Sequence, residues 1–174
     1  MNNWAKWSVL PAIVCVCPAA SYAVTYLTVE QAQEAIFPGA KLTSADVHLT
    51  EAQRKGIEKS SGIRVRNADQ KIWKTSQGEW FLLDEVLGKH EYISYAVGLA
   101  ADGSVKQVEV LDYRETYGSE IRNEKWRAQF VGKNSKSKLV LDEDIKNISG
   151  ATLSSRHITD GVKRLLALYD LVLK

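Results

Sequence analysis

The chain has 174 residues, of which 23 are basic and 21 acidic, and its formal net charge at pH 7 is +2. This length predicts one domain with a core large enough for stability without disulfides or a structural metal. The near balance of charge argues against a nucleic-acid-binding protein, whose basic face would shift that balance strongly.

The N-terminus has the pattern of a secretory signal peptide. Lys6 precedes an apolar run that ends near Val16, and "PAASYA" places Ser21 and Ala23 at the small-residue spacing that signal peptidase recognises. The run is too short for a membrane-spanning helix. We therefore expect cleavage after Ala23, export to the periplasm or another extracytoplasmic site, and a mature domain of residues 24–174. A retained N-terminal anchor is the alternative.

Both cysteines, Cys15 and Cys17, lie within this N-terminal segment. Its removal would leave no thiol for a disulfide, a thiolate metal site, an iron–sulfur cluster or a c-type haem. The three histidines (His48, His90 and His157) lack the paired spacing of metal ligands, so no metal site is expected. No other apolar run reaches the length of a transmembrane span, so no stable membrane span is expected after cleavage.

Two amphipathic helices are expected near the start of the mature domain. In each of them a threonine is followed three residues later by a glutamine, which is the spacing of a capping box. The first helix is bounded by Thr28 and Pro38, and the second by Thr50 and Gly62. Neither segment is apolar enough for a central position, so both are expected to lie on a sheet.

A series of strands is expected after the second helix. Alternating, branched and aromatic residues predict strands over residues 63–66, 70–76 and 79–88. The clearest hairpin follows in "EYISYAVGLAADGSVKQVEVLDYRE", where Asp102 and Gly103 form a two-residue turn signal. The apolar positions of its second strand shift phase once, which indicates a bulge.

The last part of the chain is predicted to be mainly helical. A helix is expected over residues 119–133 with four inward-facing residues: Ile121, Trp126, Phe130 and Val131. A short strand is expected over residues 137–145. The chain then ends in a long amphipathic helix with one apolar stripe, made by Ile158, Val162, Leu165, Tyr169 and Val172. The fold class is therefore α+β: a single domain with an antiparallel β-sheet packed with helices and a long C-terminal amphipathic helix.

The stretch "NISGATLSSRHITDGV" gathers small and hydroxylated residues just before the final helix. Gly150 and Ala151 allow another group to approach the backbone closely, and Ser154 or Ser155 is a suitable N-cap for a helix beginning near Arg156. A helix N-terminus also favours a phosphate group, and a threonine hydroxyl beside it could be esterified to one. From the residues alone, an ordinary helix cap is the simpler interpretation.

"SGATLSS" resembles the flavinylation motif of the FMN-binding domain family, Ser/Thr-Gly-Ala-Thr/Ser-x-Thr/Ser. Two further segments carry the same resemblance. "AVGLAADGSVKQVEVLDYRETYGSEI" is similar to the family's strand, Asp-Gly turn, strand and Glu-Thr-rich loop. "KWRAQFVGK" is similar to its Trp-Arg-x-Gln-Phe/Trp-x-Gly-Lys segment. Order and spacing agree from about Glu91 to Ala167.

This family includes the C subunit of the sodium-pumping NADH:quinone oxidoreductase and the G subunit of the Rnf electron-transport complex. The resemblance implies that Thr152 carries FMN through a phosphoester bond made by an ApbE-type flavin transferase, a Mg-dependent enzyme that uses FAD. It also implies a set of cofactor-binding residues: Ser149, Gly150, Ala151, Leu153, Ser154, Ser155, Glu115, Thr116, Tyr117, Gly118 and Trp126.

The chain departs from the respiratory subunits at two places. Tyr117 replaces the proline of their Thr-Pro-Gly-x-Gly loop, where it could cover the isoalloxazine ring, and Lys146 stands where they carry an acidic residue. His157, in the first turn after the motif, could meet a phosphate or be solvated.

The signal-peptide pattern and the resemblance together imply an exported flavoprotein that carries FMN and exchanges electrons with membrane or periplasmic redox proteins. A carrier is favoured over an enzyme because no substrate-oxidation site is evident. One alternative is a non-catalytic binding or sensory module of the same fold with FMN non-covalent or absent. The other is a flavin-dependent reductase, which would need a substrate base or an added domain.

Overall fold

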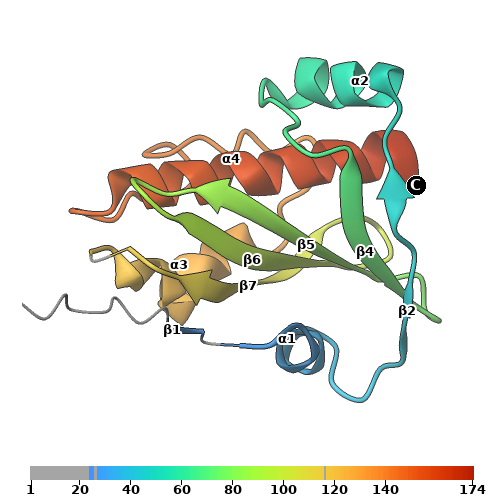
Figure 1. Cartoon of the computed structure of the whole chain (residues 1–174), viewed down its shortest axis with the longest axis horizontal. Coiled ribbons are helices and arrows are strands. Elements are labelled where there is room, and N and C mark those ends of the chain that lie inside the picture. The colour runs from blue at the N-terminus through green and yellow to red at the C-terminus, as the bar shows by residue number, and fades with distance from the viewer. Residues whose placement is uncertain (1–23, 26, 116) are drawn as a thin grey trace, which may run out of the picture.

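An antiparallel sheet lies between two helices, with α4 (Thr152–Leu168) over one face and α1 (Val29–Ile36) over the other (Figure 1). The computed structural model describes residues 24–25, 27–115 and 117–174. The expected signal peptide, residues 1–23, lies outside the described residues. The expected α+β fold, with its antiparallel sheet and long C-terminal helix, is confirmed.

The sheet has the strand order β1-β7-β6-β5-β4-β2, and β3 also pairs with β4. All these pairings are antiparallel. The strand bounds are β1 (Val24–Thr25), β2 (Leu42–Ser44), β3 (Val47–His48), β4 (Asp69–Thr75), β5 (Trp80–Leu87), β6 (Tyr92–Leu99) and β7 (Val105–Tyr113). The strands expected over 70–76 and 79–88 and the two strands of the hairpin are therefore confirmed.

The strand expected over residues 63–66 is wrong, because this segment has no regular structure. Its backbone is held by side chains of α2 (Glu51–Ser61) instead of by a neighbouring strand. Glu58 accepts a hydrogen bond from Val65 N at 2.8 Å, and Arg54 donates to the Val65 carbonyl at 3.0 Å. The alternating pattern arose because Val65 alone is fully buried there, between two arginines.

The β6–β7 hairpin has a wider turn and more bulges than expected. Its connection includes Ala100, whose N–H bonds the carbonyl of Ser104 at 2.8 Å, so the turn is longer than the two residues expected. Gly103 lies within it at φ +83°. The register skips Lys106 and Leu111, so β7 carries two bulges where one was expected. The second bulge lets both Val110 and Tyr113 face the α4 side of the sheet.

The two N-terminal helices begin with the capping boxes that the sequence predicts, at Thr28 and Thr50, and Gly62 ends α2 as expected. α1 lies on the sheet, where its residues Ala32 and Ile36 pack against strand residues. α2 differs from expectation, because it packs against α4 and not on the sheet (Figure 1).

The expected helix over 119–133 is broken into three short pieces: η1 (Ser119–Arg122), α3 (Glu124–Arg127) and η2 (Ala128–Phe130). The break occurs at Asn123, whose side chain caps α3 by accepting from Lys125 N. Ile121, Trp126 and Phe130 are buried as expected, but Val131 is 55% exposed.

The strand expected over residues 137–145 is wrong, because this segment is irregular up to residue 140 and then forms a turn over residues 142–144. The Asp144 carboxylate accepts hydrogen bonds from Val140 N at 2.8 Å and Leu139 N at 3.1 Å. These bonds fold the segment back on itself, so that only a single bridge joins Leu141 to Ile145.

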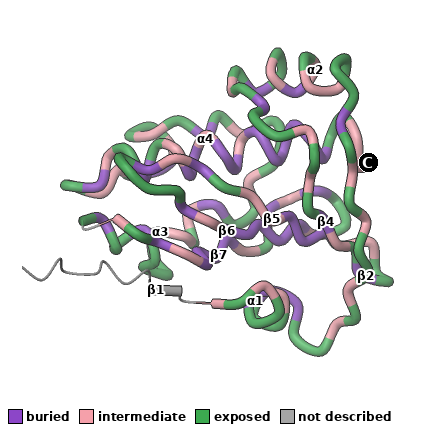
Figure 2. The backbone as a smooth tube through the Cα atoms, viewed as in Figure 1, coloured by how far each residue is buried: buried purple, intermediate pink, exposed green. Residues whose placement is uncertain are grey.

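The long C-terminal helix begins earlier than expected. Its N-cap is Ala151, and α4 continues as a π-helical segment over η3 (Tyr169–Leu173). Ser154 and Ser155, the expected caps, are buried inside its first turns. The apolar stripe packs on β5 and β6, and Figure 2 shows much of α4 and of the central strands as buried. Among the described residues, no helix is both long and apolar enough to cross a membrane.

Candidate functional site

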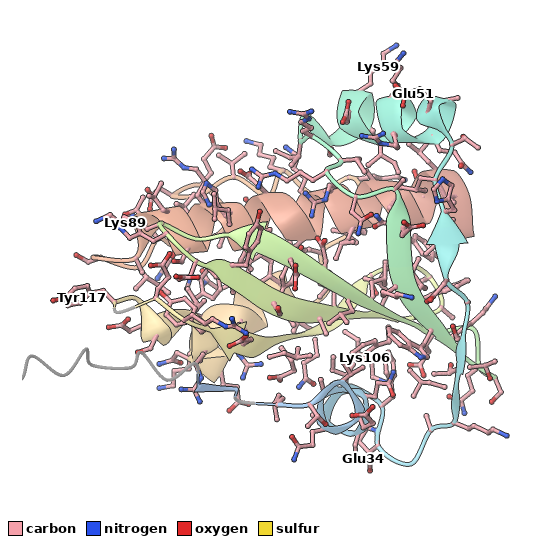
Figure 3. All side chains as sticks on the ribbon, in the orientation of Figure 1. Glu34, Glu51, Lys59, Lys89, Lys106 and Tyr117 are labelled. Atoms are coloured by element: carbon pink, nitrogen blue, oxygen red, sulfur yellow. The ribbon has the colours of Figure 1, made fainter. Side chains whose placement is uncertain are left out.

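A cavity of about 420 Å³ opens at the N-terminal end of α4. Three segments far apart in the sequence surround it: the β5–β6 turn, the loop after β7 and the first turn of α4. Figure 3 shows Lys89 and Tyr117 at this end of the molecule. The lining residues are Lys89, His90, Glu115, Tyr117, Gly150, Ala151, Thr152, Leu153 and Ser154. The volume falls in the usual range of small-ligand pockets, roughly 300–1,000 Å³.

The N-terminus of α4 is open toward this cavity. Thr152 is its first residue, and the cap residue Ala151 has no side-chain oxygen to accept from the free N–H groups of the first turn. Those N–H groups and the helix dipole favour an anion such as a phosphate. The cavity therefore offers a phosphate position beside the Thr152 hydroxyl.

The Thr152 hydroxyl is held by a neighbour on the preceding loop. Asn147 Nδ2 donates a hydrogen bond to Thr152 Oγ1 at 3.1 Å. Thr152 is half-buried, so its oxygen is both anchored and accessible.

Glu115 ties the loop after β7 to the β5–β6 turn. Its Oε1 accepts hydrogen bonds from His90 N at 2.6 Å and Glu91 N at 3.1 Å. A Cβ at Gly88 would lie 2.6 Å from the same oxygen, so only glycine permits this approach. Burial alone would raise the pKa of Glu115, but backbone N–H groups of His90, Glu91 and Lys89 outweigh it and lower the pKa.

The same loop packs closely against the start of α4 at Gly118, which has φ +96°. A Cβ there would lie 2.6 Å from both Ala151 Cβ and Tyr113 Oη. The Tyr113 hydroxyl donates to the carbonyl of Tyr117 and lies 3.4 Å from Ser154 Oγ. The side chain of Tyr117 is 81% exposed at the cavity mouth.

The structure brings together most of the residues that the sequence assigned to FMN. At the cavity lie Glu115, Tyr117, Gly150, Ala151, Thr152, Leu153 and Ser154. Gly118 packs against Ala151 next to the cavity but does not line it. Ser149 is exposed and also lies outside the lining. Ser155 is fully buried and donates its hydroxyl proton to the Ala151 carbonyl. Thr116 lies outside the described residues.

Trp126 lies away from the cavity, in the core. It is 6% exposed, packs edge to face on Phe130 and donates from Nε1 to the Lys146 carbonyl at 2.7 Å. Its place is therefore under the loop that leads to Thr152. His157 also faces elsewhere, because its Nδ1 hydrogen-bonds the Leu87 carbonyl.

Sequence reasoning missed Lys89, His90 and Asn147. The first two form the tip of the β5–β6 hairpin, and they reach the site only because β6 and β7 pair to bring that tip beside the loop after β7. A basic pair between two predicted strands was the available signal. Asn147 was indistinguishable from any polar loop residue.

Residues 88–167 match the sequence profile of the family described as "FMN-binding domain". The chain is 28% identical over 87 residues to the G subunit of the Na(+)-translocating ferredoxin:NAD(+) oxidoreductase complex of Acetobacterium woodii, a match that covers 45% of this chain and 42% of that protein. The chain thus spans less than half the length of this curated relative.

The crystal structure of NqrC from Shewanella oneidensis has the same fold, with a TM-score of 0.50 and 19% sequence identity over 80% of this chain and 72% of that one. The matched segment, residues 88–167, contains the cavity lining and all of the Ser-Gly-Ala-Thr stretch. Residues 88–167 therefore resemble an FMN-binding domain, and these matches support FMN as the cofactor of this segment.

Proposed function

We propose that this chain is an exported electron carrier whose FMN is joined to Thr152 Oγ1 by a phosphoester bond. The observation that carries the proposal is the position of that oxygen. It lies on the first residue of a 17-residue helix whose cap residue has no side-chain acceptor, inside a cavity of about 420 Å³. A hydroxyl there can hold a phosphate against the helix N-terminus.

FAD is the proposed donor of the FMN group in the attachment reaction. A bond forms between Thr152 Oγ1 and the phosphorus of the FMN half, and the pyrophosphate bond of FAD breaks. AMP leaves, and the hydroxyl proton of Thr152 is released with it. An ApbE-type flavin transferase with Mg²⁺ is the proposed catalyst.

The cavity lining suits both ends of FMN. Lys89 supplies a positive charge for the phosphate, and His90 adds a second donor at the same rim. Tyr117 and Leu153 are exposed beside the cavity, at 81% and 41%, and offer apolar surface to a flat ring. These residues support the proposal that FMN occupies this cavity.

Bound FMN accepts electrons in pairs and releases them singly, and the protein's part is to hold it with one edge accessible. A covalent bond keeps the cofactor from being lost by dilution outside the cytoplasm. The named relative from Acetobacterium woodii belongs to a ferredoxin:NAD(+) oxidoreductase complex. We infer that this chain exchanges electrons with redox proteins at a membrane or in the periplasm by docking near Tyr117.

Intact mass of the full chain, co-expressed with a flavin transferase and exported, tests the proposal. The chain should lose its N-terminal segment through Ala23 and gain one FMN less one water. Thr152→Ala should abolish the gain, whereas Ser60→Ala, which alters an exposed serine of α2 outside the lining, should retain it. An unmodified wild-type chain, or a Thr152→Ala chain that still gains FMN, would overturn the covalent assignment.

A further inference from the structure

We propose that Asn147 is a positioning residue for flavin attachment, which holds Thr152 Oγ1 in place while the phosphoester bond forms. This inference rests on the proposed function. It assigns a role to a residue outside the Ser-Gly-Ala-Thr stretch and explains what the buried Trp126 does for the site.

The side chain of Asn147 is directed at one atom. Its Nδ2 donates to Thr152 Oγ1 at 3.1 Å, and its backbone N donates to Asp142 Oδ1 at 3.2 Å. Its Oδ1 is buried and finds no hydrogen-bond partner among the described residues. A buried amide oxygen without a partner is costly, so this orientation is retained at the expense of stability.

The loop that carries Asn147 is fixed from below by two residues of the broken 119–133 segment. Trp126 Nε1 donates to the Lys146 carbonyl at 2.7 Å, and Gln129 Oε1 accepts from Lys146 N at 2.8 Å. Gln129 Nε2 in turn donates to the Trp126 carbonyl at 3.0 Å. The backbone of Lys146 is thus held on both sides while its side chain is exposed. Asn147, the next residue, therefore has a fixed starting point.

An amide donor suits Thr152 both before and after the reaction. A threonine hydroxyl can donate and accept hydrogen bonds, whereas a phosphoester oxygen can only accept. The Nδ2–H bond from Asn147 can therefore persist through the reaction, and it leaves the hydroxyl proton free to be removed. A carboxylate in the same position would compete for that proton and would face the negative charge of the phosphate.

Asn147→Asp is accordingly the sharpest variant, because it keeps the side-chain shape and removes the donor. We expect the maximum rate of flavin attachment by a transferase, with FAD and Mg²⁺, to fall at least about tenfold, because small misplacements of a reacting group cost rate steeply. The concentration of chain needed for half-maximal rate should stay unchanged, which a general loss of folding would not produce. The maximum rate of flavin attachment should also fall in Asn147→Ala.

The matched control is Asn134→Asp, which introduces the same charge on an exposed loop. Asn134 Oδ1 accepts from Lys136 N at 3.0 Å, a bond that aspartate preserves, so the attachment rate should equal that of the wild type. Thermal unfolding of each variant reports its folding. If wild type is modified and both Asn147 variants are modified at the wild-type rate, the positioning role is overturned and the attachment at Thr152 stands. If the wild type is not modified, the covalent function and this role fall together.

Discussion

Glu115 joins two loops of the candidate site through one carboxylate oxygen. The bonds from His90 N and Glu91 N come from the β5–β6 turn, while Glu115 itself follows β7. These two bonds join the turn that carries Lys89 to the loop that carries Tyr117, and both residues line the cavity. The geometry of the site therefore depends on the charge state of one side chain.

The pKa of Glu115 is lowered in the folded protein, so its contribution to stability depends on pH. The contribution is complete above the carboxyl's ordinary pKa and is lost as the pH falls through the lowered one. Glu115→Gln should therefore reduce the free energy of unfolding at pH 7, and the two proteins should converge in acid. Chemical unfolding at a series of pH values checks this. Glu124→Gln, at an exposed position on α3, should change the free energy of unfolding at pH 7 by less than about 0.5 kcal/mol.

At the scale of elements, two hydrogen bonds to the Lys146 backbone, from Trp126 on α3 and Gln129 on η2, fix the loop that leads to α4. Trp126→Phe keeps an aromatic ring against Phe130 and removes the donor to the Lys146 carbonyl. We expect a loss of about 1–3 kcal/mol in the free energy of unfolding, since a part-buried hydrogen bond is lost and the smaller ring leaves space in the core. Flavin attachment should also slow. A variant with reduced stability but the wild-type attachment rate would limit Trp126 to a structural role.

The elements that the sequence predicted well are those with local chemical signals. Thr28 and Thr50 each begin a helix with a capping box, and the alternating residues of β4 to β7 form strands. The failures occur where one polar side chain bonds the nearby backbone and so interrupts a regular pattern. Asn123 caps a new helix inside a periodic run, and the Asp144 carboxylate folds back residues that look extended.

The candidate site could likewise be predicted only in part from the sequence. The Ser-Gly-Ala-Thr stretch and the loop after β7 were recognisable as motifs, and the fold brings them to one cavity. Lys89 and His90 were not, because strand pairing alone places their turn beside Glu115. The N-cap was misassigned to Ser154 or Ser155, since a cap with no side-chain oxygen, Ala151, is not anticipated from propensity.

At the scale of the whole molecule, α4 is fastened to the sheet by a buried polar cluster. Tyr95 on β6 donates to Asp84 Oδ2 at 2.6 Å, and Arg164 on α4 pairs with the same oxygen. Burial raises the pKa of Tyr95, and the Asp84 charge adds to this effect, so the phenol stays protonated as a donor. The cluster fixes the helix whose N-terminus forms the site.

Tyr95→Phe should therefore destabilise the whole domain. Removing a hydrogen bond to a charged group, here the half-buried Asp84 carboxylate, costs about 1.5–3 kcal/mol. Tyr92→Phe provides the matched control on the same strand, because Tyr92 is 54% exposed, and it should change stability by less than about 0.5 kcal/mol. Equal effects of the two substitutions in urea unfolding would contradict this account of how α4 is held.

FMN should be attached to Thr152 and to no other hydroxyl. Trypsin cuts after Lys146 and Arg156, which releases "NISGATLSSR" with four candidate hydroxyls: Ser149, Thr152, Ser154 and Ser155. Fragmentation of this peptide from the flavinylated protein is the most direct measurement. We expect the FMN mass on Thr152 alone. FMN on a serine of this peptide, or on a different peptide, would contradict it.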